Sequence, residues 1–238
     1  MAIAVDQADL GFTLGTAASV SSIAFTSTAT VASGGFIVVG VSTYASTSTI
    51  TGVSGGGLTW TVDKQSVTTG GAGVGMASAQ APSGLASSTT ITASFSGSDV
   101  QFSSIAGLSF TGVATSSPVD GTAQDAGATM GTGAWTSGSY AIAAGSVLVG
   151  MDWQDATVSP SGHTPTSPSV EAYEHIHAVD KYGQALVYRI ESSAGSYTVA
   201  GTWAVATRDK WVAVAYKAAA GAGVTFTLAP QNISPLRA

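Results

Sequence analysis

The chain contains the same pattern of segments twice, and this internal repeat constrains its fold more than any single motif does. The segment "GGFIVVGVSTYAST", from Gly34, resembles "AGSVLVGMDWQDAT", around Gly145, and we align Gly40 with Gly150. Later in each copy, "GLASSTTITASFS" is similar to "GSYTVAGTWAV", with Ile91 opposite Val199 and Phe95 opposite Trp203. Such self-similarity indicates two similar structural units. We therefore expect pseudo-repeats over residues 19–119 and 120–218.

The composition and the alternation of side chains predict an all-β protein. Thr, Val, Ile and aromatic residues recur between clusters of Gly and Ser, whereas only 8% of residues are charged. In "KWVAVAYKAA", Trp211 and Val212 begin two alternating rows, which is the pattern of a strand with opposite faces. We count four strands per half, so two halves predict an eight-stranded sandwich of the jelly-roll or immunoglobulin-like type.

The domain prediction places both halves in one sandwich over residues 19–218. Residues 1–18 are predicted to be an N-terminal arm outside the repeat, and residues 219–238 an extended C-terminal tail. Two separate small sandwiches, 19–119 and 120–218, are the alternative. The tail contains "VTFTL", Val224 to Leu228, which alternates like a strand and could pair with a sheet edge of its own chain or of a neighbour; a disordered terminus is the alternative.

Charge and composition argue against several classes of partner. The net charge is −6, which gives no basic surface for nucleic acid. Cysteine is absent, which excludes disulfides and thiolate metal sites. No apolar stretch reaches the ~18 residues of a membrane span, and the N-terminus lacks the pattern of a secretion signal. We expect a protein made in the cytoplasm, with no membrane anchor and no cofactor.

The segment "EAYEHIHAVDKYG", from Glu171, concentrates charges and histidines that are rare elsewhere. On a strand His175 and His177 would project to one face, and a metal-dependent enzyme of the cupin kind uses such a pair. A third ligand would have to be Asp180 or His163, because no Glu or His in the cupin pattern follows. The interpretation that we favour is an exposed loop and edge strand, with no catalytic residues.

The tryptophans suggest a second kind of site, for carbohydrate. Flat aromatic rings stack on sugars, and Trp153, beside Asp152, is predicted to be the exposed ring. Trp203 and Trp211 lie at positions that are apolar in the other half, so they are predicted to belong to the core.

The segments "GLTWTV", "AQAPSG…TTITASFSG" and "AGLSFTGVATSSPVDG" resemble jelly-roll structural proteins of tailed bacteriophages and prophages. This resemblance covers about residues 20–218. It implies a non-enzymatic virion protein, as a capsid decoration, head fibre or tail-surface protein, which forms a homo-oligomer and binds other virion proteins such as the major capsid protein. A module that binds host-surface glycan is the alternative function.

Overall fold

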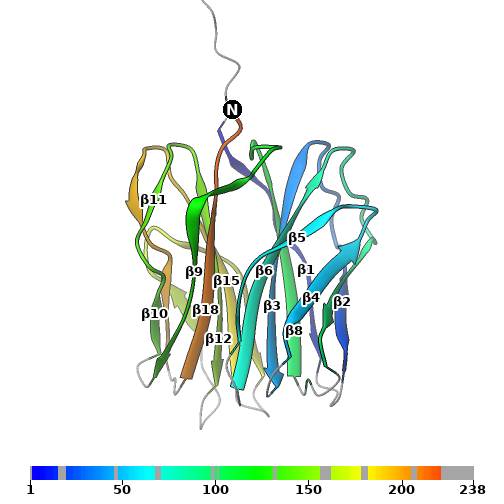
Figure 1. The fold of residues 1–238 in the computed structure, drawn as a ribbon, viewed down its shortest axis with the longest axis vertical. Coiled ribbons are helices and arrows are strands. Elements are labelled where there is room, and N and C mark those ends of the chain that lie inside the picture. The colour runs from blue at the N-terminus through cyan, green and yellow to red at the C-terminus, as the bar shows by residue number, and fades with distance from the viewer. Residues whose placement is uncertain are drawn as a thin grey trace, which may run out of the picture.

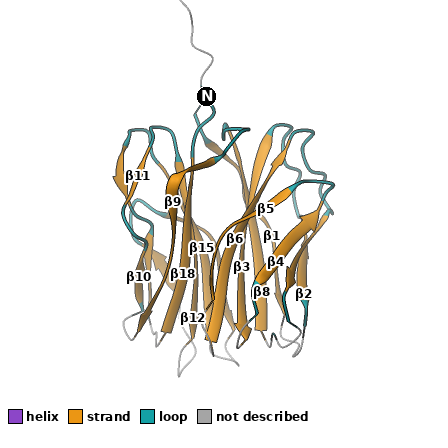
Figure 2. Cartoon of the chain, viewed as in Figure 1, coloured by secondary structure: helices purple, strands orange, loops and turns teal. Residues whose placement is uncertain are grey.

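The computed structural model describes residues 2–15, 20–45, 48–67, 71–97, 100, 102–130, 133–155, 162–177, 182–204 and 208–220. Over these residues every regular element is a β-strand, and the loops between strands contain no helix (Figure 2). All strand pairs are antiparallel, as the alternating sequence pattern predicts. The predicted all-β sandwich fold with two similar halves is confirmed.

The first half forms a five-stranded sheet in the order β1-β8-β3-β6-β5 and a three-stranded sheet in the order β2-β7-β4. Its strands are β1 (Ala4–Gly15), β2 (Ser22–Thr26), β3 (Gly35–Ala45), β4 (Ile50–Gly55), β5 (Trp60–Val67), β6 (Gly71–Ala81), β7 (Thr90–Phe95) and β8 (Phe102–Thr111).

The second half repeats this arrangement, with the five-stranded order β14-β15-β12-β18-β9 and two small sheets, β10-β17-β13 and β11-β16. Its strands are β9 (Val119–Met130), β10 (Ala134–Thr136), β11 (Tyr140–Ile142), β12 (Val147–Asp155), β13 (His163–Pro165), β14 (Val170–His177), β15 (Tyr182–Ile190), β16 (Gly195–Tyr197), β17 (Ala200–Trp203) and β18 (Arg208–Tyr216).

The sheets stack in four layers, and Figure 1 shows the two halves side by side. The two five-stranded sheets face each other across one buried apolar cluster, to which both halves contribute. Separate clusters lie between each five-stranded sheet and the small sheets of its own half. The central sheets are therefore buried on both faces, while the small sheets form the outer layers.

The expected four strands per half is wrong, because each half forms a complete sandwich of its own. The second half has two more strands than the first, since β10 and β11 together take the place of β2, and β16 and β17 that of β7. The placement of the N-terminal residues outside the repeat is also wrong. β1 pairs with β8 as β9 pairs with β18, so the N-terminal residues supply a repeated edge strand. The two halves share one buried cluster, which supports the single-domain interpretation; that interpretation stays a prediction.

The repeat aligns one residue away from the register that the sequence suggested. Gly34 and Gly145 both have positive φ, 79° and 81°, at the turn before β3 and before β12, a conformation that glycine adopts without strain. Gly34 thus corresponds to Gly145, and Gly40 corresponds to Met151 instead of Gly150. The difference matters because a shift of one residue exchanges the two faces of a strand.

A pair of aspartates confirms the corrected alignment. Asp6 Oδ2 accepts a hydrogen bond from the backbone N–H of Ala32, at 3.0 Å, and Asp120 Oδ2 accepts one from Ala143, also at 3.0 Å. Both bonds connect the first strand of a half to the turn before its central strand, β3 in the first half and β12 in the second. Each carboxylate belongs to a "VD" dipeptide near the start of its half, although the same dipeptide occurs twice elsewhere in the chain.

The chain after β18 can be followed as far as Ala220. Ala219 donates its backbone N–H to Gly112, at 2.7 Å, so the first residues of the predicted tail are anchored to the first half. Residues 221–238 lie outside the described residues. Within the described part of the chain, no helix has the length and apolar character needed to cross a membrane.

Candidate functional site

The histidine-rich segment forms β14, which is an edge strand of the second five-stranded sheet. The predicted edge strand is therefore confirmed, and β14 takes the place that β5 has in the first half. Its residues are mostly half-buried, and Tyr173 is buried, so the strand is less solvated than expected. The loop that follows, with Asp180, lies outside the described residues.

His175 and His177 lie on the face of β14 that is directed between the two central sheets. The His175 ring stacks near Tyr173 and lies 6.2 Å from the Phe12 ring of β1, whereas His177 stacks on Tyr182 with 5.1 Å between ring centroids. Burial, followed by the charge of His177, lowers the pKa of His175. Its Nε2 atom is buried without a hydrogen-bond partner among the described residues.

These two histidines have no third ligand beside them in the described structure. No group of three His, Asp or Glu side chains there could hold a metal ion. His163, the alternative third ligand, bonds elsewhere, as described below. The arrangement of His175 and His177 among aromatic rings is that of side chains packed at the margin of an apolar layer.

The predicted carbohydrate site at Trp153 is wrong in its main premise. Trp153 is only 3% exposed and stacks on Tyr44 of the facing sheet, with 6.0 Å between ring centroids. Asp152 is fully buried and accepts a hydrogen bond of 2.6 Å from Trp203 Nε1. Neither side chain can reach a sugar, because β12 is covered on both faces. Trp203 and Trp211 are buried, as predicted.

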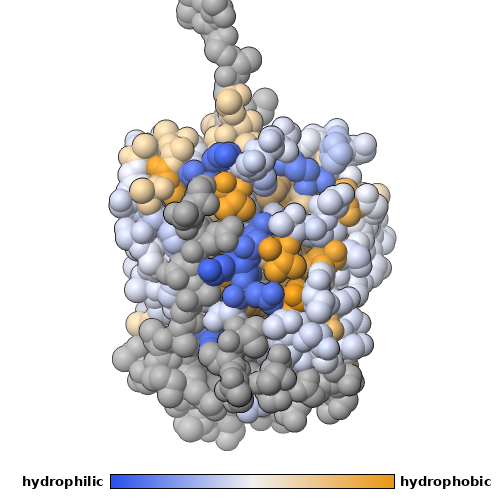
Figure 3. Space-filling model, viewed as in Figure 1, coloured by the Kyte–Doolittle hydropathy of each residue, from blue (hydrophilic) through white to orange (hydrophobic). Residues whose placement is uncertain are grey.

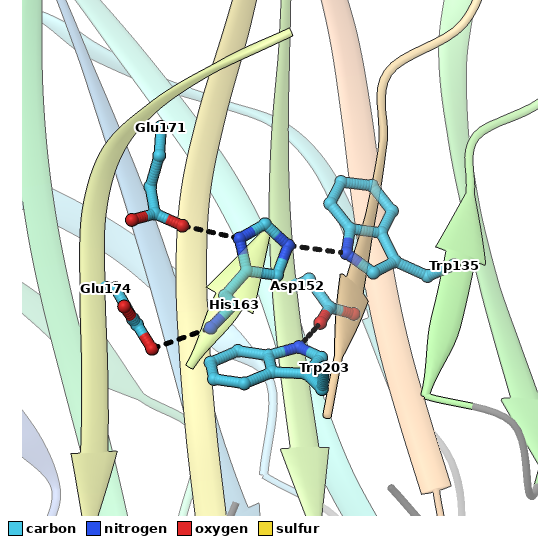
Figure 4. Close-up of polar contacts among 6 residues, drawn as sticks. All are labelled: Trp135, Asp152, His163, Glu171, Glu174 and Trp203. Carbon is cyan, nitrogen blue, oxygen red and sulfur yellow. Dashed lines mark hydrogen bonds and ion pairs between the residues drawn. The ribbon is translucent and has the colours of Figure 1, made fainter. Parts of the chain in front are cut away.

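A second polar group lies between β14 and the small sheet β10-β17-β13 (Figure 4). His163 Nδ1 lies 2.5 Å from Glu171 Oε2, and Trp135 Nε1 donates to His163 Nε2 at 3.1 Å. The backbone N–H of His163 donates to Glu174 Oε1 at 2.8 Å. In the first half, Gln65 of β5 accepts in the same way from the backbone of Ile50, so this anchor between layers is repeated while the His163 ring is an addition.

The hydrogen bonds define the protonation of the His163 ring. Because the Trp135 indole donates to Nε2, that nitrogen is unprotonated, and Nδ1 carries the proton that it donates to Glu171. Burial lowers the pKa of His163 to about 4 and raises the pKa of Glu171. The imidazole is therefore neutral near pH 7.

The pair of Glu171 and His163 has the orientation of the acid and base in a catalytic triad, but it cannot act as one. A triad base keeps Nε2 available for a nucleophile or a substrate, whereas here Trp135 occupies Nε2. The His163 side chain has no exposed surface. The sequence suggested His163 only as a metal ligand. Its contact with Glu171 depends on the pairing of β13 with β17, which no local sequence motif predicts.

A groove of about 360 Å³ opens at the upper end of β5 and β6. No lining residue is charged: Phe36, Gly57, Leu58, Thr59, Thr61, Ser78, Ala79, Gln80, Pro82 and Pro118. Figure 3 shows hydrophobic residues beside strongly hydrophilic ones near the middle of this face, where β5 crosses in Figure 1. This volume is at the small end of the range for small-molecule sites, about 300–1,000 Å³.

Two hydrogen bonds cross the apolar layer between the five-stranded sheets and so join the two halves. Tyr216 of β18 donates its hydroxyl to Asp63 of β5, at 2.7 Å, and Ser42 of β3 donates to Gln184 of β15, at 2.8 Å. Burial raises the pKa of Asp63.

Comparison with known proteins leaves the function to be argued from this geometry. No protein-family model matches the chain, and no curated protein matches it in sequence.

Proposed function

We propose that the protein is a non-enzymatic structural component of a virus particle, as a capsid decoration, head fibre or tail-surface protein. It acts through contacts with copies of itself and with other particle proteins, such as the major capsid protein, on particles assembled in the host cytoplasm. The observation that carries the proposal is the closed His163 network. In the group of described residues that most resembles a catalytic site, both ring nitrogens of His163 already bond to Glu171 and Trp135.

Two further features support an assembly role. Charged residues are few, which favours close-packed contacts over contacts that salt screens. Edge strands lie on both sides of the central layers, β1 with β14 and β5 with β9, and edges offer backbone groups to neighbouring subunits.

The test has two parts. Light scattering after size-exclusion chromatography should give a homo-oligomer of the full chain. Immunogold labelling of particles released by a strain that carries the gene should then place the protein on heads or tails. Compact monomers that do not associate with purified particles would contradict the proposal.

Glycan binding is a second candidate, supported by an exposed aromatic ring. Phe12 of β1 is 48% exposed and lies 4.8 Å from the Tyr173 ring. Stacking of a sugar on an aromatic face requires such exposure. Binding on a glycan array that Phe12→Ala abolishes, and that an exposed Thr90→Ala variant retains, would favour this function; the absence of binding by the unmodified chain would exclude it for the glycans tested.

A further inference from the structure

The upper part of β5 is an edge that the described residues leave open. β5 is the last strand of its sheet and pairs only with β6 in the described structure. An open edge presents N–H and C=O groups that can pair with an added strand. Its counterpart β14 carries Glu171 and Glu174, whereas residues 58–62, which lead into and begin β5, carry no charge.

The surface beside this edge suits an uncharged segment with alternating apolar side chains. The groove places Thr61 of the edge strand, and Thr59 just before it, next to the apolar Phe36 and Pro82. Further apolar side chains of β4, β5 and the turn between them are only partly buried where they pack against the apolar cluster of the first half: Val53, Leu58, Trp60 and Val62. An added strand would cover both groups of side chains and form hydrogen bonds with the backbone N–H and C=O groups at the edge of β5.

The C-terminal residues of the chain have the matching pattern. Residues 221–228, "GAGVTFTL", carry no charge and alternate Val224, Phe226 and Leu228 with threonines. Each half already contains its own complete set of paired strands, so this segment has no place in the repeat. The preceding Gly-Ala-Gly imposes little restriction on its direction.

The described chain before this segment runs past the groove and continues along the first half. Lys217 pairs with Pro118, which lines the groove, but Ala218 and Ala219 then bond along Val113 and Gly112. The described chain therefore leaves near the N-terminus, at the top of Figure 1.

We propose that residues 224–228 of one copy add to β5 of a second copy and cover its groove. This inference rests on the proposed assembly function and specifies the contact. The contact joins two different surfaces, so repetition around a rotation axis would close a ring.

Cysteine cross-linking tests the contact directly, because the natural chain contains no cysteine. A Thr61→Cys protein is mixed with a Thr227→Cys protein of different tag and oxidised. We expect a disulfide between the two proteins, identified by peptide mass spectrometry. Thr90→Cys, at an exposed threonine of β7, replaces Thr61→Cys as the matched control and should give no such product.

The apolar contact is tested by Phe226→Asp in the Thr227→Cys protein. The yield of the mixed disulfide should fall about tenfold, the effect of removing one anchoring aromatic contact. Deletion of residues 221–238 should also reduce the mass found by light scattering.

Three results would overturn the inference. A disulfide that forms only within one chain carrying both cysteines would show that the segment docks on its own groove. Absence of the mixed disulfide from a full chain that still forms oligomers would reject this contact and leave the proposed function standing. A full chain that is monomeric and forms no cross-link would reject both the contact and the proposed assembly function.

Discussion

The packing of Gly40 against Met151 allows a quantitative test of the central layer. A Cβ at Gly40 would lie 2.8 Å from Met151 Sδ and 3.1 Å from Leu186 Cδ1, closer than the ~3.5–4.0 Å of a favourable contact. Gly40→Ala should therefore destabilise the protein by about 1–3 kcal/mol through overpacking. Met151→Ala should cost about 2–5 kcal/mol, because it leaves a cavity in a buried layer.

The double variant should be more stable than the sum of the two losses predicts. The new methyl group at Gly40 enters the space that Met151 vacates, so we expect a coupling free energy of about 1 kcal/mol. Gly107→Ala is the matched control. Its Cβ would be equally crowded, 2.8 Å from Phe25 Cζ, but on the opposite face of the sheet, so its effect should add to that of Met151→Ala.

The assay is equilibrium unfolding in urea at pH 7, followed by tryptophan fluorescence, for the single and double variants. Coupling within error of zero for Gly40 and Met151, or equal coupling in the Gly107 control, would refute the face-to-face packing of the five-stranded sheets in this register.

Three further predictions concern polar side chains that hydrogen-bond different parts of the fold. Tyr216→Phe removes the donor to Asp63 and should cost about 1–3 kcal/mol at pH 7; because burial raises the pKa of Asp63, the loss should be smaller at pH 4, where urea unfolding is repeated. The pKa of His163 is lowered to about 4 from 6.5, so the unfolded chain binds more protons between these values and stability should fall as pH decreases through this window. That contribution is at most about 3 kcal/mol, and the raised pKa of Glu171 offsets part of it. His163→Gln should therefore reduce the slope of the free energy of unfolding against pH between pH 6.5 and 4. An unchanged slope would contradict a neutral, buried His163. Asp120→Ala removes a charged acceptor at the turn before β12 and should lower the free energy of unfolding by about 1–3 kcal/mol. Calorimetry should show this loss as a lower Tm.

The fold class could be predicted because turn residues and strand formers alternate along the whole chain. The number of layers could not. Segments such as "VLVGM" and "WVAVAY" are apolar on both faces of their strands, which is the pattern of a sheet covered on both sides. A count of alternating strands finds these central elements but misses short outer ones such as β10, β11, β13 and β16, whose three residues show no period.

The register error has a similar origin. Aligning Gly40 with Gly150 is reasonable by residue type, but the two glycines face opposite layers. Gly40 faces Met151, whereas a Cβ at Gly150 would meet Val199 and Trp135. Both positions are small for the same reason, close approach of a facing layer, so identity of residue type misled the alignment. The equivalent hydrogen bonds of Asp6 and Asp120 give the correct alignment, which the sequence alone does not mark.

The candidate site was predicted only in part. The local pattern correctly placed His175 and His177 on an edge strand. It could not reveal that Trp153 is covered by Tyr44, or that His163 meets Glu171, because these contacts join strands of different layers. Side chains that sequence reasoning assigned to ligands instead connect the layers of the fold.

The Gly40–Met151 contact also has a consequence for which residues the two equivalent positions can hold. The two residues occupy equivalent positions in the repeat and touch each other, so they lie close to the axis that relates the halves. In a dimer of identical subunits, a residue at that axis meets its own copy: two glycines would leave a void there, and two methionines would collide. When the two halves are one polypeptide this restriction is absent, because each side of the axis can change independently. A large residue, Met151, can then pack against a small one, Gly40.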